Sequence, residues 1–456
     1  MVILDLQQRG EVDQLVEDYA LRGLSRRQFL LRATALGLSF SVTGALLEAC
    51  ETNNTPSAST TLDVLNVWSG EEQDSFSAMV EPFTEQHGIK VHVESTRDLN
   101  ALLTTRLRGS NPPDIAILPN PGKMQELASH GKLIALDNLL DMDQIHNDYA
   151  QTWLELGSYQ HRLYAIFTKA ANKGTIWYNP AQFQAHHYQI PTDWQGLITL
   201  SNTISASGKY PWSMGVFSGA ASGWPAADWI AEIFLNLNGG SLYDQWVNHQ
   251  IPWTHEAVKN AFTYFGQIVG GAHYIEGAPQ SILATSFQDA SYASFQAQPT
   301  AYMYYLGDFT EGFITSRFTD ARPSRDFDFF PFPTITPQYQ GAVTGGADVV
   351  VAMRDNDAVR KLVAYLASAQ AQEIWVRRGG FTSLNRSVDL AAYPDPVAQA
   401  SARMLTQASL FRFGADDLMP SLVEDAFWKG ALDFIENQGR LDSILSSIET
   451  TAQHAY

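Results

Sequence analysis

The hydrophobic positions between residues 62 and 131 repeat with two alternating periods. Short apolar runs have the length of buried strands, and each is followed by apolar residues spaced as on one face of a helix. The clearest helix face is formed by Phe76, Met79, Val80 and Phe83. The strands are predicted at 62–68, 89–93 and 114–118, and the helices after them are predicted to end at Gly88, Gly109 and Gly131. This alternation predicts an α/β fold with a mostly parallel, doubly wound sheet.

Beyond about residue 170 the pattern changes to helices rich in Trp and Tyr, and strands return later. One helix is predicted from Trp224 through Phe234, with its end at Gly239-Gly240, and the C-terminal part of the chain is helical. The later strands are predicted at 301–305, 327–330 and 348–352. This order predicts a chain that crosses more than once between two lobes, with the crossings acting as hinges. The predicted lobes are 61–168 plus 333–370, and 169–332 plus 371–456.

Polar side chains follow the predicted strands of the first lobe, at the strand ends where open α/β sheets bind their ligands. These loops are 68–71, 95–98 and 119–122. They present an indole, hydroxyls, an amide and carboxylates, and none of them has the glycine spacing of a phosphate-binding loop. The set fits a neutral, polyhydroxylated ligand better than a nucleotide.

Composition narrows the class of protein further. The chain has 456 residues with a formal net charge of −19, 17% charged and 12% aromatic residues, and 11 Trp. It is too apolar for a disordered chain. An acidic chain without a basic patch binds nucleic acid phosphates poorly, so a nucleic-acid-binding protein is largely excluded. One cysteine excludes an internal disulfide framework and a cysteine-cluster metal site.

The first sixty residues give that cysteine a role. Arg26-Arg27 precede an uncharged stretch at 33–47, which is short for a membrane-spanning helix, and Cys50 follows it. The paired arginines resemble a twin-arginine export signal, and Cys50 stands where a lipoprotein signal has its lipidated cysteine. We predict an export signal at 1–49, a flexible tether at 50–60, and anchoring by lipid alone to the outer face of the cytoplasmic membrane. Glu48 departs from the small residue usual before such a cysteine, and an uncleaved anchor helix is the alternative.

Several short motifs occur in an order that resembles a known family. They are Pro-Asp-Ile at 113–115, the segment 127–137, Tyr-Ala-Ile at 164–166, 176–179, 305–309, 345–351, 365–375, 379–381 and 417–420. In this order they resemble the family 1 extracellular solute-binding proteins, the carbohydrate-receiving lipoproteins of ABC importers, and in part the α-glucoside branch of that family. The segment 167–171 departs from the usual proline-containing pattern. The resemblance implies a two-lobed periplasmic-binding-protein fold, type II-like, that closes over a sugar and works as a monomer with permease subunits as partners.

A sugar site needs particular residue types. Sugar rings stack on indole or phenol rings, and their hydroxyls bond to carboxylates, amides and guanidinium groups. We predict substrate contacts from Trp68, Glu71, Asn120, Trp177, Trp224, Asp228, Gly307, Asp308, Gly346, Asp348, Arg378 and Phe381. The alternative for each is structural, with the rings in the core, Asp228 at a helix start and Arg378 in a surface ion pair. Five other tryptophans are predicted to pack in the core, namely Trp194, Trp212, Trp246, Trp253 and Trp428.

Other chemistries have little support in the sequence. His186-His187 point in different directions as neighbours on a helix, and there is no HExxH zinc motif and no GxSxG nucleophile elbow. We therefore predict no cofactor, no metal and no catalytic residue. The main rival is a lipid-anchored glycoside hydrolase acting on a similar saccharide, because Glu71, Asp308 and Asp348 supply the carboxylates that such an enzyme needs. The family resemblance favours a non-catalytic receptor that delivers its sugar to an ABC importer.

Overall fold

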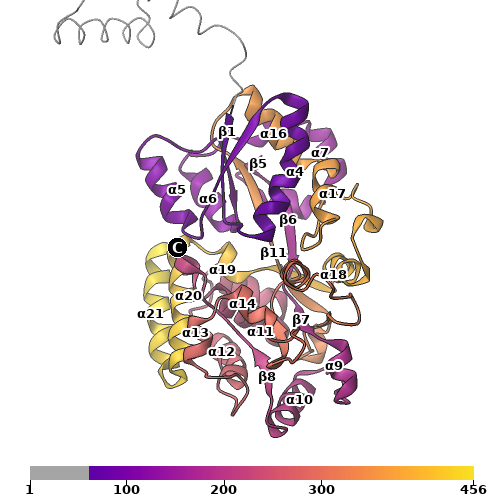
Figure 1. The fold of residues 1–456 in the computed structure, drawn as a ribbon. Coiled ribbons are helices and arrows are strands. Elements are labelled where there is room, and N and C mark those ends of the chain that lie inside the picture. The colour runs from indigo at the N-terminus through magenta and orange to yellow at the C-terminus, as the bar shows by residue number, and fades with distance from the viewer. Residues whose placement is uncertain (1–60) are drawn as a thin grey trace, which may run out of the picture. The chain divides into compact units, whose positions relative to one another are not determined.

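Two β-sheets organise residues 61–456, which are the residues that the computed structural model describes (Figure 1). The first sheet has the strand order β12-β11-β3-β1-β2, and β6 also pairs with β11. The second sheet has the order β10-β7-β9-β8. The strands of the first sheet are β1 (Thr61–Asn66), β2 (Lys90–Ser95), β3 (Ile115–Leu118), β6 (Ala165–Asn172), β11 (Ala342–Ala352) and β12 (Leu410–Phe413). Those of the second are β7 (Thr175–Tyr178), β8 (Tyr210–Ser213), β9 (Ala301–Tyr305) and β10 (Asp328–Pro331), and a separate hairpin is formed by β4 (Ser158–Tyr159) and β5 (Arg162–Leu163).

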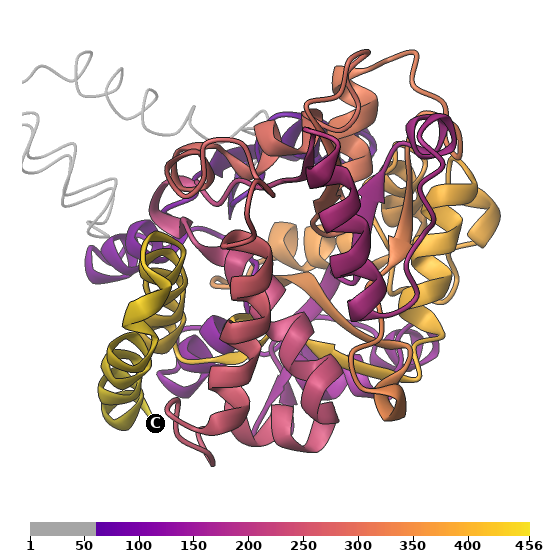
Figure 2. The same cartoon turned by 90° about the horizontal axis from the view of Figure 1, so that it is seen from below.

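Helices cover both sheets, and each sheet with its helices is called a lobe below. The helices of the first lobe are α4 (Glu71–His87), α5 (Leu99–Arg108), α6 (Pro121–Ser129), α7 (Met142–Asp148), α8 (Gln151–Leu156), α16 (Asp357–Ala367) and α17 (Ala369–Val376). Those of the second are α9 (Pro180–Ala185), α10 (Trp194–Ala206), α11 (Trp224–Val247), α12 (Glu256–Val269), α13 (Gln280–Ala284), α14 (Phe287–Tyr292), α15 (Thr310–Arg317), α20 (Ser421–Glu436) and α21 (Leu441–Ala455). Two more, α18 (Pro396–Thr406) and α19 (Ala415–Leu418), contact elements of both lobes. Seen from below, α20 and α21, in yellow, run side by side along one flank (Figure 2).

The strand directions differ from the predicted mostly parallel arrangement. In the first sheet β1 is parallel to β2 and β3, as predicted, but β11 runs antiparallel to both β3 and β6. In the second sheet β7 is antiparallel to β9 and β10, and only β8 and β9 are parallel. Both sheets are therefore mixed. Strand β12 joins the first sheet although its residues lie in the range that the sequence pattern gave to the second lobe.

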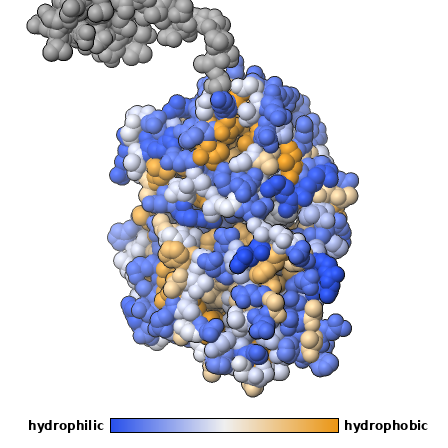
Figure 3. Space-filling model, in the orientation of Figure 1, coloured by the Kyte–Doolittle hydropathy of each residue, from blue (hydrophilic) through white to orange (hydrophobic). Residues whose placement is uncertain are grey.

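Each lobe has its own hydrophobic core. One cluster includes Val64, Ile117 and Val350 of the first sheet together with the buried face of α4 that the helical spacing predicts. The other is built on α11, α12 and the C-terminal helices, with Phe262 and Phe427 among its rings. Hydrophilic side chains cover most of the face drawn in Figure 3, with scattered apolar patches. No helix among residues 61–456 is long and apolar enough to span a membrane.

The predicted end of the helix at Gly239-Gly240 is confirmed, because Gly239 is non-helical and divides α11 into two helical segments. Gly239 has a φ of 74°, and a Cβ there would lie 2.4 Å from a ring carbon of Tyr339. Only glycine fits that conformation and that approach. A second helical segment follows this break, and its Tyr243 and Trp246 bury their rings in the core of the second lobe.

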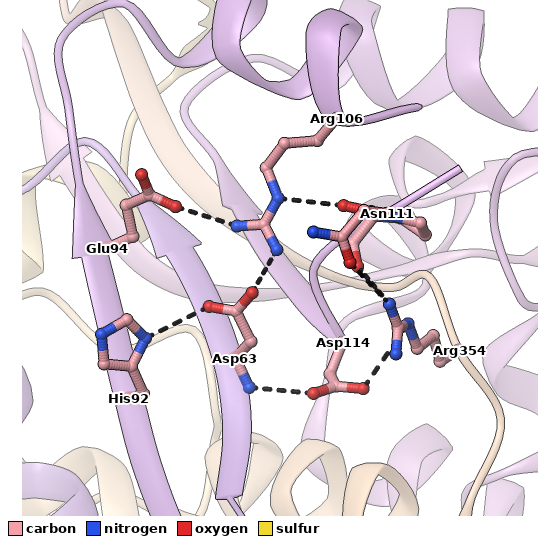
Figure 4. A network of polar contacts seen from close by, with 8 residues as sticks. Asp63, His92, Glu94, Arg106, Asn111, Asp114 and Arg354 are labelled. Carbon is pink, nitrogen blue, oxygen red and sulfur yellow. Dashed lines mark hydrogen bonds and ion pairs between the residues drawn. The ribbon is translucent and has the colours of Figure 1, made fainter. Parts of the chain in front are cut away.

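A polar network ties β1, β2 and the loop before β3 together in the first lobe (Figure 4). The Arg106 guanidinium at the end of α5 donates to Asp63 of β1 and, at 2.9 Å, to Glu94 of β2. Asp114 accepts from the backbone N–H of Asp63 at 2.9 Å, and Arg354 lies 3.9 Å from the Asp114 carboxylate. These charges therefore join β1, β2 and the loop before β3 to the end of α5.

Candidate functional site

A cleft of about 600 Å³ is lined by residues of both lobes. In the first lobe, the lining residues follow the ends of β1, β2 and β3. They are Trp68, the segment 97–101 and Asn120. From the second lobe the loop 219–222, the start of α11 and the segment 416–432 line it. The cleft therefore lies where parallel strands end, as the strand–helix pattern predicted.

Five of the twelve predicted contact residues line this cleft. They are Trp68, Asn120, Trp224, Gly346 and Asp348. Their contact with a ligand stays a prediction, but the structure brings together residues that lie far apart in the sequence. The Trp68 indole N–H donates to Asp348 Oδ2 at 2.9 Å, across 280 positions of the chain.

The structure places the other predicted residues off the cleft surface, each for a packing reason. Trp177 is fully buried and donates its indole N–H to the Leu306 carbonyl at 3.1 Å. Phe381 packs against Trp375 in the core of the first lobe, with ring centroids 5.0 Å apart. Asp228 is buried behind the cleft in an ion pair with Lys173.

The remaining four positions also have structural partners. Asp308 accepts hydrogen bonds from the Thr382 and Ser401 hydroxyls at 2.8 and 2.9 Å, and the neighbouring Gly307 leaves room for the Phe309 ring. Arg378 donates to the Ser75 hydroxyl at 2.8 Å and pairs with the fourth residue, Glu71, at 3.4 Å. The surface ion pair foreseen for Arg378 is therefore present.

One wall of the cleft joins an indole to a set of buried charges. Lys169 Nζ lies 2.8 Å from Glu72 Oε1 and 3.9 Å from Asp348 Oδ2, and it faces the Phe309 ring at 5.0 Å. Burial raises the pKa of Asp348, although Lys169 opposes the shift. For Lys169, burial alone lowers the pKa, but Glu72 and Asp348 raise it on balance. The ammonium stays charged near Asp348, the carboxylate that accepts the Trp68 indole N–H.

The opposite wall is built from α19 and α20. The Trp428 indole N–H donates to Asp416 Oδ2 at 2.7 Å, and Asn120 Nδ2 donates across the cleft to both oxygens of Glu424 at 2.7 and 2.8 Å. Burial and the nearby Asp416 and Asp417 raise the pKa of Glu424 well above its usual range. Trp428, predicted as a core residue, packs against the second core and lines the cleft as well.

Sequence reasoning missed most of the charged residues of this site. Among the charged residues that line the cleft, the predicted contacts did not include Glu72, Arg97, Lys169, Lys173, Asp416, Asp417 and Glu424. A usable signal existed for Lys169, because a lysine inside the apolar run of β6 is buried only where it has partners. Asp417 lay in the motif 417–420, whose residues were used for the resemblance but not for the site.

The charges of the cleft disfavour an anionic ligand. Among the described residues, four cations line it, Arg97, Lys169, Lys173 and Lys429, and each already has a carboxylate within 4.0 Å. No cluster of histidines and acids in residues 61–456 is arranged to hold a metal ion. The site is therefore made of aromatic faces and hydrogen-bonding groups whose charges are largely paired.

Comparison with known proteins assigns the family. The sequence profile described as "Bacterial extracellular solute-binding protein" matches residues 69–373. The chain belongs to this family. The osmoprotective compounds-binding protein GgtB of Synechocystis sp. is 34% identical over 373 residues, which cover 82% of this chain and 88% of that protein. The α-glucosides-binding periplasmic protein AglE of Rhizobium meliloti is 30% identical over 392 residues, covering 84% of this chain and 85% of that protein.

Solved structures of solute-binding proteins share the fold. The bacterial solute receptor AcbH superposes with a TM-score of 0.77 at 20% identity, covering 87% of this chain and 99% of that one. Maltose-bound MalE3 of T. maritima superposes with a TM-score of 0.70 at 16% identity, covering 87% and 100%. The predicted two-lobed binding-protein fold is confirmed. The prediction of a solute-binding protein rather than an enzyme is confirmed by the family, and GgtB and AglE are each named as binding proteins.

Proposed function

We propose that this solute-binding protein captures a neutral carbohydrate, an α-glucoside or similar oligosaccharide, between its lobes and delivers it to the permease of an ABC importer. The observation that carries the proposal is the composition of the cleft. The partly exposed indoles of Trp224 and Trp428 line it together with carboxylates and an amide, Trp68 backs one wall with only 2% of its surface exposed, and the described cations of the cleft are paired. This is the set that stacks on sugar rings and bonds to their hydroxyls. The α-glucosides-binding relative, 30% identical over most of both chains, supports the same ligand class.

Closure of the cleft supplies the signal to the permease in this proposal. A ligand that contacts both walls binds the closed form more tightly than the open form and so shifts the population toward closure. The Asn120–Glu424 pair already joins the two walls, and the Ser421 hydroxyl donates to Glu126 Oε2 at 2.8 Å beside it. A monomer is sufficient for this mechanism because both walls belong to one chain.

Export and anchoring form a separate part of the proposal. The twin-arginine signal, the tether and Cys50 lie outside the described residues, so the proposal rests on the sequence and on the extracellular character of the family. In the full chain, Cys50→Ala is expected to release the protein from the membrane fraction after export, and Ser59→Ala is the matched control. Retention of the Cys50→Ala variant on membranes would remove the lipid anchor from the proposal.

Isothermal titration calorimetry with α-linked di- and trisaccharides tests the ligand class, with β-linked cellobiose and a uronic acid disaccharide for comparison. We expect tight binding of at least one α-linked sugar without any release of monosaccharide, and no binding of the acidic sugar. Trp224→Ala is expected to weaken binding by about 2 kcal/mol, roughly thirtyfold in Kd, and Trp224→Phe by less. Hydrolysis of the sugar would favour the glycosidase instead, and binding only of a peptide, amine or anion would refute the carbohydrate proposal.

A further inference from the structure

The chain passes between the lobes at three places that lie against one another. The first is 172–175 between β6 and β7, the second leads into β11, and the third is Gly414 between β12 and α19. The backbone N–H of Lys173 donates to the Thr344 carbonyl at 3.0 Å, and that of Gly414 donates to the Gly345 carbonyl at 2.8 Å. The three crossings are therefore hydrogen-bonded into one bundle.

The Lys173 ammonium lies inside this bundle and touches all three crossings. It belongs to the first crossing, a Cβ at Gly346 of β11 would lie 2.9 Å from its Cε, and a Cβ at Gly414 would lie 3.2 Å from its Nζ. Gly346 was predicted to allow close approach of a ligand, whereas here its missing side chain makes room for the lysine. Any larger residue at these two positions displaces the ammonium.

Two carboxylates, one from α11 and one from α19, hold the ammonium. Nζ lies 2.7 Å from Asp228 Oδ1 of α11 and 3.0 Å from Asp417 Oδ2 of α19, and all three side chains are buried. A buried ion set of this kind is weak support for stability, because desolvation offsets much of the attraction between its charges. Its position at the crossings indicates a role in the movement of the lobes.

One donor of the ammonium is left for a ligand. A lysine ammonium has three N–H donors, and in the described part of the chain the Nζ of Lys173 makes two hydrogen bonds. Lys173 also lines the cleft, with its Nζ 6.0 Å from the ring centroid of Trp224. A ligand oxygen placed beside Trp224 is therefore within reach of the third donor.

We propose that Lys173 is a ligand-contacting and positioning residue that couples occupation of the cleft to closure of the lobes. Its third N–H bonds to a ligand oxygen while the other two hold α11 and α19 against the three crossings, so a bound ligand fixes the angle between the lobes through one side chain. The ligand contact rests on the proposed function, and the tie between the crossings does not.

The test has one arm without ligand and one with it. Lys173→Met removes the charge but keeps most of the length of the side chain. The variant Lys173→Met/Asp228→Asn/Asp417→Asn also removes the carboxylates that the lysine neutralises, in case the single variant does not fold. Lys259→Met, which removes a lysine from an exposed ion pair with Asp442, is the matched control.

In the first arm, hydrogen exchange of the free protein followed by mass spectrometry is expected to speed up together in peptides covering 172–175, 342–346 and 413–417 in both Lys173 variants. In the second arm, the sugar found by calorimetry is expected to bind about tenfold more weakly or worse, and to contract the protein less in X-ray scattering than it contracts the wild type.

Faster exchange confined to 172–175 would overturn the tie between the crossings. Unchanged affinity and unchanged contraction would overturn the coupling. If the wild-type protein binds no saccharide, the proposed function fails. The hydrogen-exchange arm still tests whether Lys173 holds the three crossings together.

Discussion

The buried carboxyl of Glu232 gives the sharpest prediction about stability. Its side chain in α11 has no exposed surface and accepts from the Thr344 backbone N–H at 2.7 Å and from Asn236 Nδ2 at 3.1 Å. Burial raises the pKa of Glu232 from 4.5 to about 7, although the Thr344 and Asn236 hydrogen bonds oppose the shift. Between these two values the folded protein holds a proton that the unfolded chain has released. Stability from this group is therefore full at acidic pH and is lost as pH rises through about 7.

The variant Glu232→Gln is neutral at every pH, so it removes this dependence. Each pKa unit corresponds to about 1.4 kcal/mol. The difference in unfolding free energy, variant minus wild type, is therefore expected to rise by roughly 2 to 3 kcal/mol between pH 5 and pH 8. Urea unfolding at pH 5, 6, 7 and 8, followed by far-ultraviolet circular dichroism at constant ionic strength, measures the difference.

Asp137→Asn is the matched control for this series. The bidentate Arg162 guanidinium lowers the pKa of Asp137 below its usual value, so that carboxylate stays ionised throughout pH 5 to 8. Its contribution is lost only at lower pH, as the pH falls through the folded pKa. The difference in unfolding free energy between Asp137→Asn and the wild type should therefore not change between pH 5 and pH 8. An equally flat difference for Glu232→Gln would refute the reasoning about Glu232.

Three further predictions concern a buried hydrogen bond, a close backbone approach and a charged network. Trp177→Phe removes the hydrogen bond to Leu306 and is expected to cost about 1 to 2 kcal/mol of unfolding free energy with no loss of sugar affinity; weaker binding in calorimetry would restore the ring as a ligand contact. Gly122→Ala places a Cβ 2.4 Å from the Met419 carbonyl oxygen, so a drop in Tm and weaker binding are expected, and an unchanged Tm would contradict the close approach of α6. Arg106→Met is expected to lower the unfolding free energy by about 1 to 3 kcal/mol in dilute buffer and by less in 1 M salt. The same loss at both ionic strengths would point to packing instead of charge.

Much of the first lobe was predictable because its signals are local. The spacing of Phe76, Met79, Val80 and Phe83 predicts the buried face of α4 almost residue by residue, and the three strands before and after it follow the predicted order. Strand direction was not predictable in the same way. The antiparallel β11 returns from the other lobe, and its partners β3 and β6 are chosen by tertiary packing rather than by its own residues.

The candidate site was only half predictable for a related reason. Topology placed Trp68 and Asn120 at the cleft because strand ends can be found in a sequence. The charged groups could not be placed that way, since the partners of Lys173 are 55 and 244 positions away. Trp177 shows the opposite error, because a tryptophan near a crossing has the same sequence signal whether it faces a ligand or the core.

The late position of β12 has a consequence for how the protein is made. Strand β12 (Leu410–Phe413) completes the first sheet, which begins with β1 at Thr61. The Trp68 indole also bonds to a residue of β11, far along the chain. The first lobe therefore lacks its last strand until residues 410–413 have been synthesised. Contacts this distant in sequence slow folding and leave strand edges exposed while they wait for their partners. On the ribosome the sheet of this lobe is therefore completed only after residues 410–413 have been synthesised. A transport route that accepts proteins already folded, as the paired arginines predict, would let that slow assembly end before the membrane is crossed.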